Sequence, residues 1–242
     1  MMKQSIVFLT PFVTLATVVT ADRTITVRNQ CSSTIWPALF TDPNAGSAVP
    51  SQATGWEMAS GTSVSFTVSN NWTAGRVWPR TGCDFSTSQD ASSCATGGCS
   101  GGLECTDGTA AAPVTLAEFT LSSSLSDFYD VSLVNGFNVP VGITNTIGCA
   151  VSNCPVNLNA NCPAKLQKKD ATGNVVGSDS PSCCTGSFST AATCPATGVP
   201  DYAFFKNNCP NSVVFPYDNS GGVPLLVCPG SQGADYIITF CP

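Results

Sequence analysis

One stretch near the middle of the chain alternates between apolar and polar residues. Residues 117–121 and 130–133 each change character at every step, which is typical of strands with one buried face. The serine run at 122–124 lies between them and is a turn signal. We therefore expect the two strands to pair as a hairpin. Asn135-Gly136 predicts a second tight turn that leads into a third strand at 137–139.

The hairpin brings two acidic residues together. If it is symmetric about Ser124, Glu118 lies directly opposite Asp130 on the polar face. Side chains paired in this way have Cβ atoms roughly 4.5–5.5 Å apart. A slip of one residue would place the two acids on opposite faces. Asp127 is a nearby third carboxylate, but its odd position points it away from Glu118.

The same patterns recur along the rest of the chain. Further strands are predicted where short alternating or apolar runs occur, at 24–27, 34–36, 64–68, 76–78, 213–215 and 236–240. The intervening stretch 41–61 is rich in Pro, Gly, Ala and Ser and reads as loop, and 162–168 predicts one short helix. Many short strands with almost no helix favour an all-β fold, an antiparallel β-sandwich.

The N-terminal segment has the form of a signal peptide. Residues 1–21 carry one lysine, a mainly apolar run and small residues at the end. A membrane anchor would need about 20 apolar residues, and threonines and a proline interrupt this run. We expect a secreted protein, extracellular or in the cell wall, that begins near Asp22 and does not insert stably in a membrane.

Composition narrows the possible chemistry. The chain has 242 residues, 14 cysteines, no histidine and a formal charge of −6. Histidine-based triads and histidine-containing zinc sites are therefore excluded. The nine basic residues never cluster beyond Lys168-Lys169, which argues against nucleic-acid binding. We expect no cofactor or metal, and any catalysis must use carboxylates.

The cysteines indicate disulfides. Four lie in the loop-like stretch 83–105 and seven in 149–209. In a secreted chain, cross-links are favoured over metal binding. We assign one domain over 22–242, with a sandwich core at 22–148 and 205–242 and a disulfide-rich lobe at about 149–204 that contains the short helix. Asn71-Trp72-Thr73 is a sequon for N-glycosylation.

Several motifs, in order along the mature chain, closely resemble the thaumatin-like family of secreted, often defence-related proteins. These are GRVW at 75–78, RTGC at 80–83, CATGGC at 94–99, TLAEF at 115–119, GFNVP at 136–140, CPAKL at 162–166, FFK at 204–206 and ITFCP at 238–242. The resemblance implies an antiparallel sandwich, a disulfide-rich lobe and a cleft between them with an acidic floor.

The resemblance also implies the disulfide pairs. Family members commonly have eight, and this chain can form seven. The implied pairs are Cys31–Cys241, Cys83–Cys94, Cys99–Cys105, Cys149–Cys228, Cys154–Cys209 and Cys184–Cys194. Cys162 and Cys183 lack their usual partners, so we predict that they bond to each other.

The family's acidic cleft is usually built from one arginine, one glutamate and three aspartates. The matching positions here carry Arg76, Glu118, Asp130, Asn135 and Asp218. Asn135 departs from the pattern, because an amide cannot act as an anionic nucleophile or base. Purely structural interpretations of these residues also remain open. In these, Arg76 and Glu118 form a structural ion pair, and Asn135 and Asp218 are turn residues.

The resemblance implies recognition of β-1,3-glucan or another cell-wall polysaccharide, with possible endo-β-1,3-glucanase activity in cell-wall remodelling or antifungal defence. A monomer is the default expectation for the oligomeric state. Glu118 is the expected acid, because crowding by Asp130 and Asp218 would raise its pKa, and Asp130 is the second carboxylate. The aromatic candidates for stacking on sugar rings are Phe128, Tyr129, Phe137 and Tyr217. The alternatives are a non-catalytic glucan-binding module and an antifungal effector that acts on membranes or proteins.

Overall fold

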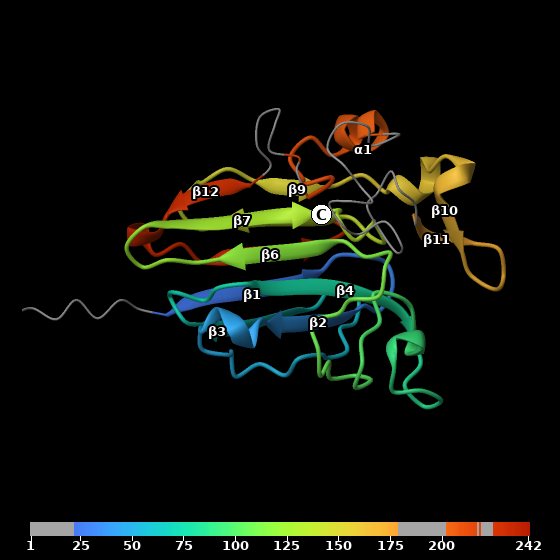
Figure 1. The fold of residues 1–242 in the computed structure, drawn as a ribbon, viewed down its shortest axis with the longest axis horizontal. Coiled ribbons are helices and arrows are strands. Elements are labelled where there is room, and N and C mark those ends of the chain that lie inside the picture. Colours follow the sequence, from blue (N-terminus) through green and yellow to red (C-terminus); the bar gives the residue numbers. More distant parts are fainter. Residues whose placement is uncertain (1–21, 179–201, 217, 219–224) are drawn as a thin grey trace, which may run out of the picture.

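The computed structural model describes residues 22–178, 202–216, 218 and 225–242. The predicted signal peptide, Tyr217, and Cys183, Cys184 and Cys194 lie outside these residues. The described part is a β-sandwich with additional loops and one short lobe (Figure 1). The all-β prediction is therefore confirmed.

One sheet of the sandwich has five strands in the order β3-β1-β13-β8-β9. β1 and β13 are parallel neighbours, whereas the other pairs are antiparallel. The strand bounds are Arg23–Asn29 (β1), Ser63–Val68 (β3), Val141–Asn145 (β8), Ser152–Cys154 (β9) and Tyr236–Phe240 (β13). β9 belongs to this sheet although its sequence lies within the range assigned to the lobe.

The second sheet runs β12-β7-β6-β4-β2, and β5 adds to β4. Its pairs are all antiparallel. The bounds are Trp36–Thr41 (β2), Gly75–Cys83 (β4), Cys94–Thr96 (β5), Leu116–Thr120 (β6), Ser126–Ser132 (β7) and Leu226–Pro229 (β12). The predicted strand at 34–36 is only the start of β2. It does not pair with β1, since the two belong to different sheets.

Aromatic rings join the two sheets across the core. Tyr236 of β13 lies 5.4 Å from the ring centre of Phe119 and 5.1 Å from that of Tyr129, which belong to the opposite sheet. Trp72 stacks on Phe119 at 5.9 Å. All four side chains are buried. Neighbouring residues of a strand point to opposite faces. Because Phe119 and Tyr129 point into the core, the residues next to them in their strands point to the outer face of the second sheet.

The register of the β6–β7 hairpin agrees with the expectation from alternation. Glu118 pairs directly with Asp130. Asp127 points to the other face, where Arg23 Nη1 lies 3.2 Å from its Oδ2 and Tyr236 donates a hydrogen bond of 2.8 Å. The third carboxylate thus belongs to a buried polar network inside the sandwich.

The expected third strand at 137–139 does not form. The turn at Asn135-Gly136 is present, with Gly136 at φ 90° and its N–H donating to Leu133 O. The chain then continues as a loop, and β8 begins at Val141. The backbone groups of this segment bond to a side chain instead: Asn138 N donates to Thr115 Oγ1 at 3.3 Å, and Val139 O lies 3.0 Å from the same hydroxyl. These bonds replace strand pairing.

The helix predicted at 162–168 does not form there. That segment forms a single 3-10 turn, Ala164–Leu166, followed by β10 (Gln167–Lys169), which pairs with β11 (Val175–Ser178). The described α-helix is α1 (Tyr202–Asn208), which buries Phe205. Pairing of β10 with β11 in a hairpin overrides the helix signal. The stretch 213–215 also differs from its prediction, since it makes one isolated bridge, Ser132 to Val213.

Other short 3-10 turns connect the strands. They are Pro43–Ala45 (η1), Ala91–Ser93 (η2), Leu158–Asn161 (η3) and Gly230–Gln232 (η8).

Within the described residues, no helix has the length and apolar character needed to cross a membrane.

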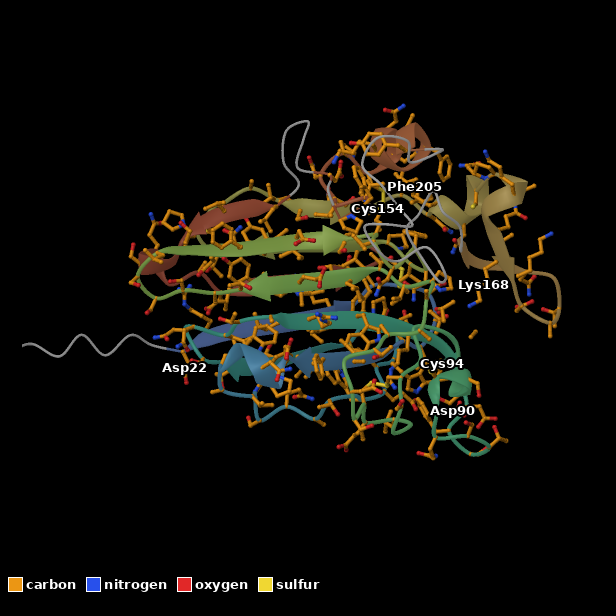
Figure 2. The ribbon with its side chains drawn as sticks, viewed as in Figure 1. Asp22, Asp90, Cys94, Cys154, Lys168 and Phe205 are labelled. Carbon is orange, nitrogen blue, oxygen red and sulfur yellow. A yellow bond between two sulfur atoms is a disulfide. The ribbon has the colours of Figure 1, made fainter. Side chains whose placement is uncertain are left out.

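Five of the seven expected disulfides are present in the described residues: Cys31–Cys241, Cys83–Cys94, Cys99–Cys105, Cys149–Cys228 and Cys154–Cys209. The last of these joins β9 to the residue that follows α1, and Cys154 lies near Phe205 in Figure 2. Cys162 is buried. Its predicted partner, Cys183, and the pair Cys184–Cys194 lie outside the described residues.

Candidate functional site

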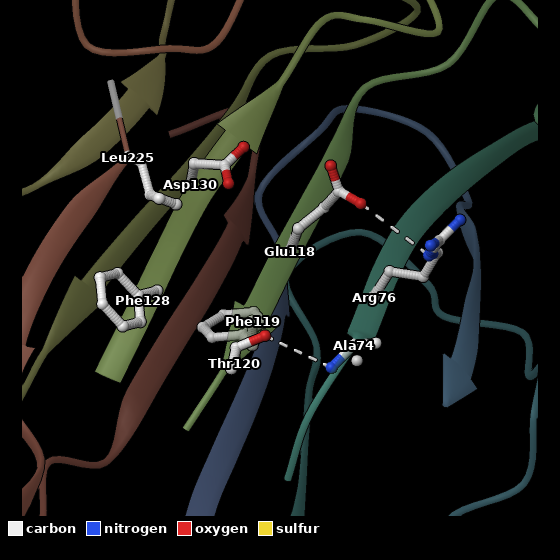
Figure 3. Close-up of a pocket in the computed structure, with 9 residues that line it drawn as sticks. Ala74, Arg76, Glu118, Phe119, Thr120, Phe128, Asp130 and Leu225 are labelled. Carbon is white, nitrogen blue, oxygen red and sulfur yellow. Dashed lines mark hydrogen bonds and ion pairs between the residues drawn. The ribbon is translucent and has the colours of Figure 1, made fainter. Parts of the chain in front are cut away.

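Three charged side chains form a row across the outer face of the second sheet. The registers pair Asp130 of β7 with Glu118 of β6, and Glu118 with Arg76 of β4. Figure 3 shows the Glu118 carboxylate between the other two groups. The row exists because core residues alternate with these positions in each strand, so that the charged residues point outward.

The row lines a cavity of about 250 Å³. Its apolar side is made by Phe128 and Leu225, which stand beside Asp130 (Figure 3). Both are partly exposed, at 38% and 41%, so the cavity is open to solvent. The full lining is Ala74, Gly75, Arg76, Glu118, Phe119, Thr120, Phe128, Asp130 and Leu225.

Arg76 supplies the positive charge of the site. Its Nε lies 3.9 Å from Glu118 Oε1, and the two side chains are 30% and 34% exposed. An ion pair this long and this exposed contributes at most about 1 kcal/mol to stability. The guanidinium also lies over the Phe40 ring, 5.9 Å from its centre. Its Nε is buried and makes no hydrogen bond within the described part of the chain. Arg76 thus keeps donor capacity beside Glu118.

Asp130 is the buried member of the acidic pair. Burial raises the pKa of its carboxyl well above the ordinary value for an aspartate, and the negative charge of Glu118 raises this pKa further. Asp130 is therefore the group that the structure equips to hold a proton. The sequence analysis instead expected Glu118 to be the acid. The two carboxyls differ in burial: Asp130 is 8% exposed and lies beside Leu225 (Figure 3), whereas the Glu118 side chain is 34% exposed.

Of the four aromatic candidates, Phe128 lines the cavity, whereas Tyr129 and Phe137 do not. Tyr129 is fully buried, and its hydroxyl donates to Ala150 O. Phe137 is also fully buried. Both are core residues, so their prediction as sugar-stacking side chains is wrong. Tyr217 lies outside the described residues.

Asp218 does not line the cavity. It is a buried carboxylate that accepts hydrogen bonds from Tyr202 Oη at 2.6 Å, Lys206 Nζ at 3.0 Å and Val214 N at 3.0 Å. Two of these donors belong to α1. The contacts assign Asp218 to the attachment of α1, which corrects its predicted role in binding substrate.

Asn135 is likewise absent from the cavity lining. Its backbone oxygen accepts a hydrogen bond from Val114 N at 2.9 Å, within the turn that ends at Gly136. The turn interpretation of Asn135 agrees with this position. Asn71, the predicted glycosylation site, is exposed in the turn before β4.

Leu225 and Gly75 were missed by the sequence prediction. Leu225 precedes β12, where three apolar residues in a row carry no alternation. Gly75 is needed because a Cβ atom there would lie 2.2 Å from the Trp72 ring. A glycine just before a predicted strand, close to a buried tryptophan, was the available signal for close backbone approach.

The donor set gives no support to a metal centre. Among the residues that the structure describes, no group of three or more His, Cys, Asp or Glu side chains is arranged to hold a metal ion.

The sequence model for the Thaumatin family matches residues 29–242. The chain belongs to the Thaumatin family. It is 39% identical to thaumatin-like protein 1 of Pyrus pyrifolia over 231 residues, covering 90% of both chains. It is 40% identical to a glucan endo-1,3-beta-glucosidase of Prunus avium over 235 residues, again covering 90% of each. It is also 40% identical to pathogenesis-related protein 5 of Arabidopsis thaliana over 230 residues, covering 90% and 89%.

Proposed function

We propose that this protein is secreted, binds β-1,3-glucan across the cavity over Arg76, Glu118 and Asp130, and cleaves it as an endo-acting glycoside hydrolase. The observation that carries the proposal is the directly opposed carboxyl pair, whose two members differ in burial. The Prunus avium relative named glucan endo-1,3-beta-glucosidase supports the choice of substrate.

Hydrolysis of a glycosidic bond requires one protonated carboxyl as acid and a second carboxylate as nucleophile or base. Asp130, with its raised pKa, donates the proton to the departing glycosidic oxygen. Glu118 either attacks the anomeric carbon or activates a water for the attack. Arg76, 3.9 Å from Glu118, offers donors to substrate hydroxyls beside the reacting bond.

The apolar side of the cavity suits the C–H face of a sugar ring. Phe128 and Leu225 stand on the Asp130 side and Arg76 on the other (Figure 3). A ring held between them presents its hydroxyls to the charged row. Because the lining is partly exposed, a polymer can cross the site without threading an end into it, which favours endo cleavage.

The deciding experiment measures release of new reducing ends from a soluble β-1,3-glucan by the mature protein. Parallel assays use Glu118→Gln, Asp130→Asn and the matched control Glu57→Gln, an exposed glutamate outside the cavity. Parent and control should cleave, whereas both cavity variants should lose activity by about 100-fold or more. Equal activity in parent and cavity variants would exclude the carboxyl pair as the catalytic group.

A second function is binding without cleavage. The positions of Asn135 and Asp218 favour it, because only three of the five positions of the family's acidic set line the cavity. In that case parent and Asp130→Asn would both bind insoluble glucan, and neither would release reducing ends.

A further inference from the structure

A second depression lies at one end of the sandwich and shares no lining residue with the acidic cavity. It has a volume of about 490 Å³, within the range of small-molecule sites. β4 separates the two sites: Arg76 lines the first, and Thr81, five residues further on, lines the second. Odd spacing places them on opposite faces of the strand, roughly 17 Å apart along it.

The lining of the depression is partly apolar and partly polar. The apolar part includes the disulfide Cys31–Cys241 together with Val139 and Pro140. The polar part includes the exposed residues Gln30, Ser32, Ser33 and Asn157, which carry amides and hydroxyls.

None of the lining residues is charged, although the chain as a whole carries −6. An ionic ligand would find no counter-charge here. A neutral ring with one C–H face and several hydroxyls matches both parts of the surface, because amides donate and accept hydrogen bonds.

Hydrogen bonds and a disulfide hold part of the lining in place. Asn138 uses its whole amide: Nδ2 donates to Pro79 O and Thr96 Oγ1, and Oδ1 accepts from Thr115 N at 3.1 Å and Val139 N at 2.8 Å. The disulfide holds the ends of β1 and β13 beside it. A site held in place before binding loses less entropy when its ligand binds.

Asn159 leaves one acceptor unused in the wall. Its Nδ2 donates to Asn138 O at 2.8 Å. Its Oδ1 is buried and accepts no hydrogen bond within the described part of the chain. Buried acceptors are normally satisfied. A ligand hydroxyl that reaches Asn159 would satisfy this one.

We propose that this depression is a second saccharide site that binds a neutral glucosyl unit of the same polysaccharide. The choice of polymer rests on the proposed function, whereas the neutral hydroxylated ligand follows from the depression itself. Two sites on one rigid strand would raise the avidity for an insoluble polymer without changing cleavage in the acidic cavity.

The test follows backbone and side-chain amide signals of the isotope-labelled mature protein by NMR during titration with a short β-1,3-linked gluco-oligosaccharide. Two clusters of signals should shift, one around Gln30, Ser33 and Asn159 and the other around Glu118 and Phe128. The double variant Gln30→Ala/Ser33→Ala should lose the first cluster of shifts alone. Its binding to insoluble glucan should weaken at least about tenfold. Its melting temperature verifies folding.

The matched control is Gln232→Ala/Ser231→Ala, which removes the same exposed groups from η8 at a place outside both sites. It should behave like the parent. Shifts at the acidic cavity alone would overturn the second site and leave the proposed function standing. Shifts at the depression alone would overturn the proposed function and leave the second site standing. No shift at either place would overturn both.

Discussion

Asp130 and Glu118 face each other across β6 and β7, yet Asp130 is buried whereas the Glu118 side chain is 34% exposed. Two carboxyls of similar intrinsic acidity thus occupy unlike environments. Such a difference is what lets one carboxyl hold a proton while its neighbour stays available as nucleophile or base.

The raised pKa of Asp130 predicts a pH dependence of stability. Burial makes the folded protein bind this proton more tightly than the unfolded chain does. The stabilisation is complete below the unfolded pKa, near 3.9, and is lost as the pH rises toward the folded pKa. Asp130→Asn removes this loss. Its melting temperature should therefore rise relative to that of the parent as the pH is raised above about 4. A difference that stays constant with pH would contradict the assignment.

Asp218→Asn should reduce stability but not glucan binding. The substitution removes the negative charge 3.0 Å from the Nζ of Lys206, whose side chain is 21% exposed. Breaking a buried pair costs about 3 kcal/mol at the low end of its range. Denaturant unfolding measures the loss, and pull-down on insoluble glucan measures binding. Weak binding by a variant that is still fully folded would return Asp218 to the substrate site.

Phe128→Ala should weaken glucan binding without a large loss of stability. Phe128 is 38% exposed and forms the apolar side of the cavity. Loss of its contact with a sugar ring costs about 1.5 kcal/mol, or roughly tenfold in affinity. Val227→Ala is the control, because Val227 pairs with Phe128 on β12 and is 52% exposed but does not line the cavity. Equal affinities for the two variants would remove Phe128 from the site.

Asn71 should carry an N-linked glycan when the protein is secreted from a eukaryotic cell. Its side chain is exposed, and the Thr73 hydroxyl lies in the same turn, donating to Asn71 O at 3.0 Å. Enzymatic deglycosylation should lower the intact mass. Asn71→Gln should abolish the change, whereas Thr73→Ser should retain it, since serine also satisfies the sequon. An unmodified parent protein would disprove the prediction.

Local alternation was enough to place Glu118 opposite Asp130, because strand period and turn position together determine the register. It could not show which of the two carboxyls has the raised pKa. Asp130 lies beside Leu225 (Figure 3), which precedes β12 in a continuous apolar run without period. Asp218 depends on donors from α1, which are equally non-local.

Parity along β7 could have separated the aromatic residues. Phe128 shares the even positions of Asp130 and faces outward, whereas Tyr129 occupies the odd positions of the core. Phe137 offered no such signal, because the hydrogen bonds of Asn138 remove its segment from any strand.

The parallel pairing of β1 with β13 also constrains the order of assembly during synthesis. β1 is made first among the described strands and β13 last, and they are sheet neighbours. Until residues 236–240 leave the ribosome, β1 and β8 each have an unpaired edge where β13 belongs. The five-stranded sheet is therefore completed only after β13 has been made, and a chain shortened before Tyr236 would expose two strand edges to association with other chains.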